Sequence, residues 1–180
     1  MDSIYECKTQ KIGGNMREHI NQTIRQLPDS VFSFIIAFSR IEYAMKLHGM
    51  VNARARIKWI ESDWDVLIVQ LDISTQERHE LTFFDHVSDI PSLAVIIREP
   101  PKRLCIVDGR LAGLDTPDVE DTYTLIGAMR TVRNNLFHGI KFTSVWGNIQ
   151  RDTELVESSL VIIEEILNMM PNLKERFLWG

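Results

Sequence analysis

The chain has 180 residues, of which 44% are hydrophobic and 25% are charged, and its formal net charge is -5. This balance is ordinary for one globular domain with a real core, so the chain needs no disulfide or metal to stabilise it. The negative net charge argues against a general DNA-coating protein, because affinity for phosphates rises with the number of lysines and arginines, but it permits a local basic site.

The cysteine and hydropathy patterns favour the cytoplasm. The two cysteines, Cys7 and Cys105, have no CxxC spacing, which predicts reduced structural thiols and no zinc site. No stretch approaches the roughly 18 apolar residues that span a bilayer. The N-terminus lacks the basic region, apolar run and cleavage site of a signal peptide. We therefore expect a cytoplasmic protein that does not contact membranes.

The N-terminal part is expected to contain a leader and two helices. Residues 1–14 are predicted to form a polar leader, and residues 15–180 a single domain. The first helix is expected from Asn15 to Leu27, before Pro28. The second has apolar residues spaced by three and four, which indicates one buried face. Its expected N-cap is Asp29 or Ser30, its C-terminal glycine is Gly49, and its apolar residues are Val31, Phe34, Ile35, Phe38, Ile41 and Met45.

The middle of the chain is less regular. Ser62 is a suitable N-cap for the segment 62–71, with Asp63 and Asp65 in the first turn. The apolar run within it fits either a helix or a buried strand, and residues 78–86 are ambiguous.

A short helix and a loop-rich insertion are expected next. Ser88 or Asp89 can cap a helix that has Pro91 in its first turn and runs toward Arg98. The insertion covers residues 99–117, and its segment RLCIVDGRLAGL can form a small hairpin or an irregular loop.

Two long helices are expected in the C-terminal part. The first runs from residue 118 to 135, and the second follows a loop at 143–147, with Asp152 as its N-cap and Pro171 at its end. Their apolar stripes are Leu125, Met129, Val132 and Leu136 in the first, and Leu155, Ile162, Ile163, Ile166 and Met170, with Ser159, in the second. The predicted fold class is an all-α bundle of four to six helices.

The segment 133–139, Arg-Asn-Asn-Leu-Phe-His-Gly, carries the chemistry. Arg133 offers a permanent charge in a planar fork that suits phosphate. His138 can both accept and donate a proton near neutral pH. The amide of Asn134 can orient either of them.

Helical geometry restricts how these side chains meet. Asn134 and His138 are four residues apart and share a face, which Arg130 extends. Arg133 lies five residues before His138, about 140° around a regular helix. Either the helix ends between them, as Gly139 suggests, or a second copy of the chain completes the site.

The extended motif resembles the signature of the HEPN superfamily, in which an arginine and a polar residue are followed by histidine four to six positions after the arginine. The resemblance spans roughly residues 30–170. Other segments that look similar to plasmid- and prophage-borne HEPN proteins are FSRIEYAMK (38–46), SDWD (62–65), EPPKRLCIVDGRLAG (99–113) and the start of the last helix (151–155).

The resemblance implies a HEPN-like helical bundle that forms a homodimer across the motif and acts as a toxin or defence endoribonuclease. In that reading His138 is the general acid and base, Arg133 stabilises charge on the phosphate, and Asn134 positions them. The nucleophile is the 2′-hydroxyl of the RNA, so no metal or other cofactor is expected. A cognate antitoxin is a further partner that the resemblance permits.

Three further positions are candidates for the site, and two of them have a second interpretation. Arg130 and Lys141 could bind substrate phosphates, and Lys141 could equally be a solvated lysine. Glu42 could be a partner of the motif's charged side chains. It could also be a rim residue paired with Lys46, which is the more ordinary interpretation.

A basic run beside tryptophans is a weaker candidate. Arg54, Arg56 and Lys58 lie near Trp59 and Trp64, a combination that can bind single-stranded RNA. Such a run is more often a solvated face with tryptophans in the core.

Two alternatives to an enzyme stay open. The chain could be an inactive HEPN module that binds RNA, a nucleotide or a partner protein. It could also be a structural helical protein in which His138 only caps a helix, since histidine before glycine is favoured at a helix C-terminus, and an arginine five residues before a histidine also arises by chance.

Overall fold

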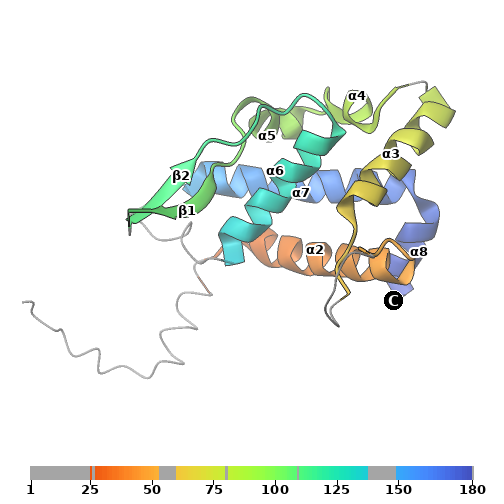
Figure 1. Cartoon of the computed structure of the whole chain (residues 1–180), viewed down its shortest axis with the longest axis horizontal. Coiled ribbons are helices and arrows are strands. Elements are labelled where there is room, and N and C mark those ends of the chain that lie inside the picture. Colours follow the sequence, from red (N-terminus) through yellow and green to blue (C-terminus); the bar gives the residue numbers. More distant parts are fainter. Residues whose placement is uncertain are drawn as a thin grey trace, which may run out of the picture.

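The protein is mainly helical, with one short β-hairpin at one end of the molecule (Figure 1). The computed structural model describes residues 25, 27–52, 60–79, 81–108, 110–137 and 149–179. Within them the elements are α2 (Asp29–Leu47), α3 (Trp64–His79), α4 (Phe83–Val87), the 3-10 turn η1 (Pro91–Leu93), α5 (Ala94–Arg98), β1 (Arg103–Val107), β2 (Arg110–Leu114), α6 (Thr122–Phe137), α7 (Ile149–Met169) and α8 (Pro171–Trp179). The prediction of a mostly helical fold is confirmed.

Helix α7 is the centre of the bundle. It packs against α2, α3, α5, α6, α8 and η1. In Figure 1, α2 and α7 run along the long axis, and α6 crosses them toward the end that carries the hairpin. This crossing brings the C-terminal end of α6, where the motif begins, next to α2.

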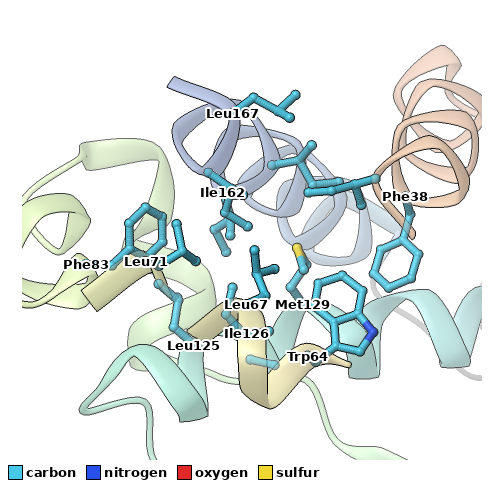
Figure 2. Close-up of a cluster of buried hydrophobic side chains, with 14 of the residues drawn as sticks. Phe38, Trp64, Leu67, Leu71, Phe83, Leu125, Ile126, Met129, Ile162 and Leu167 are labelled. Carbon is cyan, nitrogen blue, oxygen red and sulfur yellow. The ribbon is translucent and has the colours of Figure 1, made fainter. Parts of the chain in front are cut away.

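The core is formed by side chains from α2 to α8, and Figure 2 shows part of it. Each large side chain that is fully buried contributes about 1.5–3 kcal/mol relative to exposure, so this cluster accounts for most of the apolar stabilisation. The labelled members are Phe38 from α2, Trp64, Leu67 and Leu71 from α3, Phe83 from α4, Leu125, Ile126 and Met129 from α6, and Ile162 and Leu167 from α7.

Helix α2 begins at Asp29, directly after Pro28, without a side-chain cap. Its N-cap position is Pro28, which makes no side-chain hydrogen bond, so the predicted caps Asp29 and Ser30 are wrong. The fixed φ of proline (−57° here) suits a helix start, and Asp29 lies in the first turn, where the helix dipole favours a negative charge. Gly49 follows the helix with a φ of +85°, as predicted for its C-terminus.

The apolar run that the sequence left ambiguous forms helix α3, and the N-cap of this helix is Asp63. The Asp63 Oδ1 atom accepts a hydrogen bond from the Val66 amide at 3.2 Å. The predicted cap, Ser62, is wrong because that residue forms an isolated bridge with Val51 and its hydroxyl donates to the Glu42 carbonyl at 3.0 Å.

The ambiguous segment 78–86 contains the end of α3 and a capped short helix. Thr82 and Asp85 form a reciprocal capping box at the start of α4. Ser88 ends this helix, so neither Ser88 nor Asp89 is an N-cap for the next one, and that expectation is wrong. Pro91 does occupy the first turn that leads to Arg98, as predicted.

The insertion contains the hairpin that the sequence left open. Strands β1 and β2 are antiparallel, with Val107 paired to Arg110. Asp108 has a φ of 50°, the left-handed conformation that a tight two-residue turn requires and that aspartate tolerates.

Both C-terminal helices differ from their predicted bounds. Helix α6 begins at Thr122 instead of 118 because Asp121 accepts a hydrogen bond from the Thr124 amide at 2.7 Å, and it continues to Phe137. Asp152 is buried in the first turn of α7 and is not its N-cap.

Pro171 starts an additional helix that the sequence did not predict. Proline fits the first helical position because that residue needs no intrahelical N–H, and α8 continues from it to Trp179. Arg40 of α2 donates from Nε to the Phe177 carbonyl at 2.9 Å, so this carbonyl in the last turn of α8 has a hydrogen-bond donor.

The expected leader, most of the helix predicted from Asn15 to Leu27, and the loop at 143–147 lie outside the described residues. None of the helices within the described ranges is long and apolar enough to cross a lipid bilayer.

Candidate functional site

Arg133 lies one turn before the described end of α6, and its guanidinium is held between two aromatic rings. The Cζ atom is 4.3 Å from the centre of the Phe137 ring and 5.5 Å from that of Phe38. Phe137 is four residues after Arg133 on α6, and Phe38 comes from α2. Guanidinium faces are attracted to aromatic rings, so the packing of α6 on α2 fixes the orientation of this arginine.

Glu42 completes the surroundings of Arg133. It stands one helical turn after Phe38 on α2, and its Oε2 atom lies 3.9 Å from Nη2 of Arg133. The Arg133 and Glu42 side chains are 34% and 28% exposed. At this distance and exposure the ion pair is a weak one, so Glu42 orients the arginine without occupying all its donors.

The guanidinium of Arg133 keeps unused hydrogen-bonding capacity. Its Nη1 donates to Oδ1 of Asn134 at 3.1 Å. Its Nε is buried and has no hydrogen-bond acceptor among the residues that the structure describes. A buried donor without an acceptor is unfavourable, and here it belongs to a group whose planar fork suits a phosphate.

A second arginine of α6 is held in a similar way. Arg130 lies 5.6 Å from the centre of the Trp64 ring. Trp64 in turn stacks on Phe38, with ring centres 5.3 Å apart and planes tilted by 33°, and Figure 2 shows these two rings side by side at the edge of the core. Two arginines, one turn apart, therefore flank one buried aromatic pair.

The two neighbouring asparagines have different roles. Asn134 is exposed and bonds Arg133. Asn135 is 2% exposed. Its Oδ1 accepts from the Leu104 amide at 3.4 Å, and its Nδ2 donates to the Lys102 carbonyl at 2.9 Å. Asn135 therefore fastens the hairpin to α6.

A cavity of about 350 Å³ lies between the start of β1 and the exposed face of α6. We call it the hairpin cavity. Its lining residues are Arg103, Leu104, Gly127, Arg130, Thr131, Asn134 and Asn135.

The structure brings four of the predicted positions into one region. Arg130 and Asn134 line the hairpin cavity, Asn134 bonds Arg133, and Glu42 lies beside Arg133. The functional roles of these residues stay predictions.

His138, Gly139 and Lys141 lie outside the described residues, as does the basic run of Arg54, Arg56 and Lys58 with Trp59. The angle between Arg133 and His138 therefore stays a prediction. Trp64 is 5% exposed, so its assignment to the core is confirmed.

Three contributors were missed from the sequence. Phe38 and Phe137 carried a usable signal, because each stands four residues from Glu42 or Arg133 on its own helix. Arg103 carried none, since only the docking of the hairpin on α6 brings it to the cavity.

Cys105 is a free, half-buried thiol in β1, and Cys7 lies outside the described residues. No group of three or more His, Cys, Asp or Glu side chains in the described part of the chain is arranged to hold a metal ion. Comparisons of the chain with protein-family models, with curated proteins and with solved structures found no match.

Proposed function

We propose that this protein is a homodimeric, metal-independent endoribonuclease of the HEPN type, with Arg133, Asn134 and His138 as its catalytic residues. The observation that carries the proposal is the Arg133 guanidinium, oriented by two aromatic rings and Glu42 yet left with a buried donor that has no acceptor among the described residues. In the sequence, His138 directly follows the last described residue of α6.

The proposed reaction uses the RNA's own 2′-hydroxyl as nucleophile. His138 accepts the proton of this hydroxyl, the 2′-oxygen bonds to the adjacent phosphorus, and the bond from phosphorus to the 5′-oxygen breaks. A histidine then returns a proton to the leaving 5′-oxygen, which leaves a 2′,3′-cyclic phosphate and a 5′-hydroxyl. Arg133 stabilises the charge that develops on the phosphate oxygens, and Asn134 keeps the arginine in place.

A second copy of the chain gives the site its second histidine. Two-fold symmetry would bring an identical Arg133 and His138 pair to the same cleft, so that one histidine accepts a proton while the other donates one. In the cytoplasm such an enzyme would act as a toxin or defence effector, with an antitoxin as a cognate partner.

The test is incubation of the purified protein with total RNA and with a tRNA pool in excess EDTA. Wild type is compared with His138→Ala, Arg133→Ala and the control Arg176→Ala, which removes an exposed arginine of α8. We expect fragments with cyclic-phosphate ends from wild type and control, and none from the two motif variants. Circular dichroism checks that the variants are folded. Intact RNA from a folded, dimeric wild type would contradict the proposal.

A binding module without cleavage activity is the second candidate. It is favoured by the hairpin cavity, which gathers Arg103 and Arg130 and involves no residue of the proposed proton transfer. This candidate predicts that RNA or a nucleotide binds but that no strand is cut. It would be preferred if labelled RNA were bound by wild type and recovered intact.

A further inference from the structure

We infer that the hairpin cavity is a phosphate-binding site for the backbone of single-stranded RNA, with Arg103 and Arg130 as its charged residues. The inference deepens the proposed function, because it adds a substrate contact beside the motif. Its test does not depend on cleavage.

The charged side chains that line the cavity are two arginines, which are hydrogen-bond donors. Arg103 at the start of β1 and Arg130 on α6 are both exposed, and neither forms an ion pair with a described residue. No carboxylate is among the lining residues that the structure describes. Two uncompensated guanidinium groups in one concave site attract an anion, and a phosphate oxygen matches their planar geometry.

Two acidic side chains near the hairpin, Glu99 and Asp115, are paired elsewhere. Asp115 lies 2.8 Å from Lys102 Nζ, and Glu99 lies 3.4 Å from Nε of Arg151. The positive charge of the cavity is therefore not cancelled by these neighbours.

The cavity is held in shape by contacts that are independent of any ligand. Asn135 fixes the backbone of β1 through the Leu104 amide and the Lys102 carbonyl. Arg130 rests on the Trp64 ring. A preformed site loses little freedom when a ligand binds, which favours affinity.

Asn134 connects the cavity to the motif. Its Oδ1 accepts from Arg133, so its Nδ2 group remains to donate toward a ligand in the cavity that Asn134 also lines. A phosphate bound there would lie next to the one at Arg133, which is the arrangement that successive phosphates of one strand require. The strand would then be fixed on one side of the bond to be cut.

The lining favours a backbone phosphate over a free nucleotide. Among the described residues, Leu104 is the one large apolar side chain that lines the cavity, and no described aromatic ring does so. A free nucleotide is usually held through its base as well as its phosphates, with stacking on aromatic side chains. A site whose charged groups are two arginines and whose described lining has no aromatic ring suits the repeating, base-independent part of RNA.

Gly127 provides a sharp probe of the cavity. It forms part of the α6 wall, and a Cβ atom added there meets no atom within 4 Å. Gly127→Glu would place a carboxylate beside the two arginines, and Gly127→Gln would place a neutral group of almost the same shape. Both exchanges remove a glycine from a helix interior, so neither should weaken α6.

The experiment measures binding by fluorescence anisotropy with a labelled single-stranded RNA that carries 2′-O-methyl groups throughout. This RNA cannot be cleaved through its 2′-hydroxyl, so binding is read separately from activity. The variants are Arg103→Ala, Gly127→Glu and Gly127→Gln, and the control is Arg176→Ala, which causes the same loss of charge on α8. Unlabelled ADP and inorganic pyrophosphate are added as competitors.

We expect Arg103→Ala to weaken binding on the order of 10-fold and to lower the salt dependence by about one phosphate contact. Gly127→Glu should weaken it further, and Gly127→Gln should stay closer to wild type. Equal affinities for Arg103→Ala and Arg176→Ala, or for the Glu and Gln variants, would overturn the inference. If ADP displaced the RNA at ADP concentrations below the RNA concentration, the cavity would be assigned to a free nucleotide instead.

Discussion

The two ends of helix α6 carry polar clusters of opposite kinds. At its start, Thr122 is 2% exposed, donates to Asp72 Oδ1 at 2.6 Å and accepts from the Phe84 amide at 3.1 Å. The same Asp72 oxygen accepts from the Phe83 amide at 2.9 Å. At the other end, Arg133 is one-third exposed and has a donor with no acceptor among the described residues.

Under the proposed function, this difference separates a structural cluster from the site. Buried polar groups are normally all hydrogen-bonded, and a fully satisfied cluster fixes how elements pack. Asp72 and Thr122 do this for α3, α4 and α6. The cluster around Arg133 is oriented but not fully satisfied, and under the proposed function the exposed part of the guanidinium binds the ligand. The predictions below test this contrast.

The largest effect is expected for Arg133→Lys. Lysine keeps the positive charge but loses the planar fork and the stacking on Phe38 and Phe137. Cleavage should fall on the order of 100-fold, as when one stabilising donor of a transition state is removed. The unfolding midpoint should move little, because the ion pair with Glu42 is long and partly exposed.

Rates are measured on RNA in EDTA, beside urea unfolding of both proteins. A lysine variant as active as wild type would mean that Arg133 supplies only charge, and the contrast between the two ends of α6 would lose its functional half.

Asp72→Ala should have the opposite profile. It leaves the Thr122 hydroxyl and the Phe83 amide without their acceptor, and each group of this kind costs about 1–3 kcal/mol when it stays buried. We expect the free energy of unfolding to fall by about 2–4 kcal/mol and the rate per folded molecule to stay unchanged.

Urea titrations followed by circular dichroism measure the first quantity, and activity at low temperature measures the second. A stable variant with reduced cleavage would show that this cluster also serves the site.

Asn134 and Asn135 repeat the contrast within one turn. Asn135→Ala removes both hydrogen bonds that fasten β1 to α6, and we expect a loss of about 1–2 kcal/mol in the free energy of unfolding. Asn134→Ala should lower the free energy of unfolding by less than about 0.5 kcal/mol because the side chain is exposed. It should nevertheless lower cleavage more than Asn135→Ala does.

The pair is compared in the same two assays. A larger loss of stability for Asn134→Ala than for Asn135→Ala would contradict the assignment of Asn135 as the residue that fastens β1 to α6.

The apolar stripes were predictable because packing follows helical periodicity. The buried residues of α2 and the stripe from Leu125 to Val132 lie where spacing by three and four places them. Helix starts were less predictable, because Ser62, Ser88 and Asp152 are all acceptable caps by composition, and the contacts of neighbouring elements decide which residue turns the chain.

The site was predictable only in part for the same reason. Arg133, Asn134 and Glu42 carry local signals, namely a motif and a carboxylate near an apolar stripe. Nothing local distinguishes Asn134 from Asn135, since their difference arises from a hairpin that docks on one of them. Arg103 likewise reaches the cavity through tertiary packing alone.

The smallest expected effect is on the pH dependence of stability, and it concerns the start of α6. The hydrogen bonds from the Thr124 side chain and amide hold the pKa of Asp121 below its ordinary value. A lowered carboxyl pKa contributes stability above the ordinary value of about 3.9, and this contribution is lost as the pH falls through the folded-state pKa. Asp121→Asn should therefore be slightly less stable than wild type at pH 6, by less than about 1 kcal/mol because Asp121 is exposed and solvent screens its charge. The difference should be smaller at pH 3, because the stabilisation is progressively lost as the pH falls from the ordinary value toward the folded-state pKa. Thermal unfolding at the two pH values measures it, and a difference that grew in acid would mean that the start of α6 is not stabilised by the ionised form of Asp121.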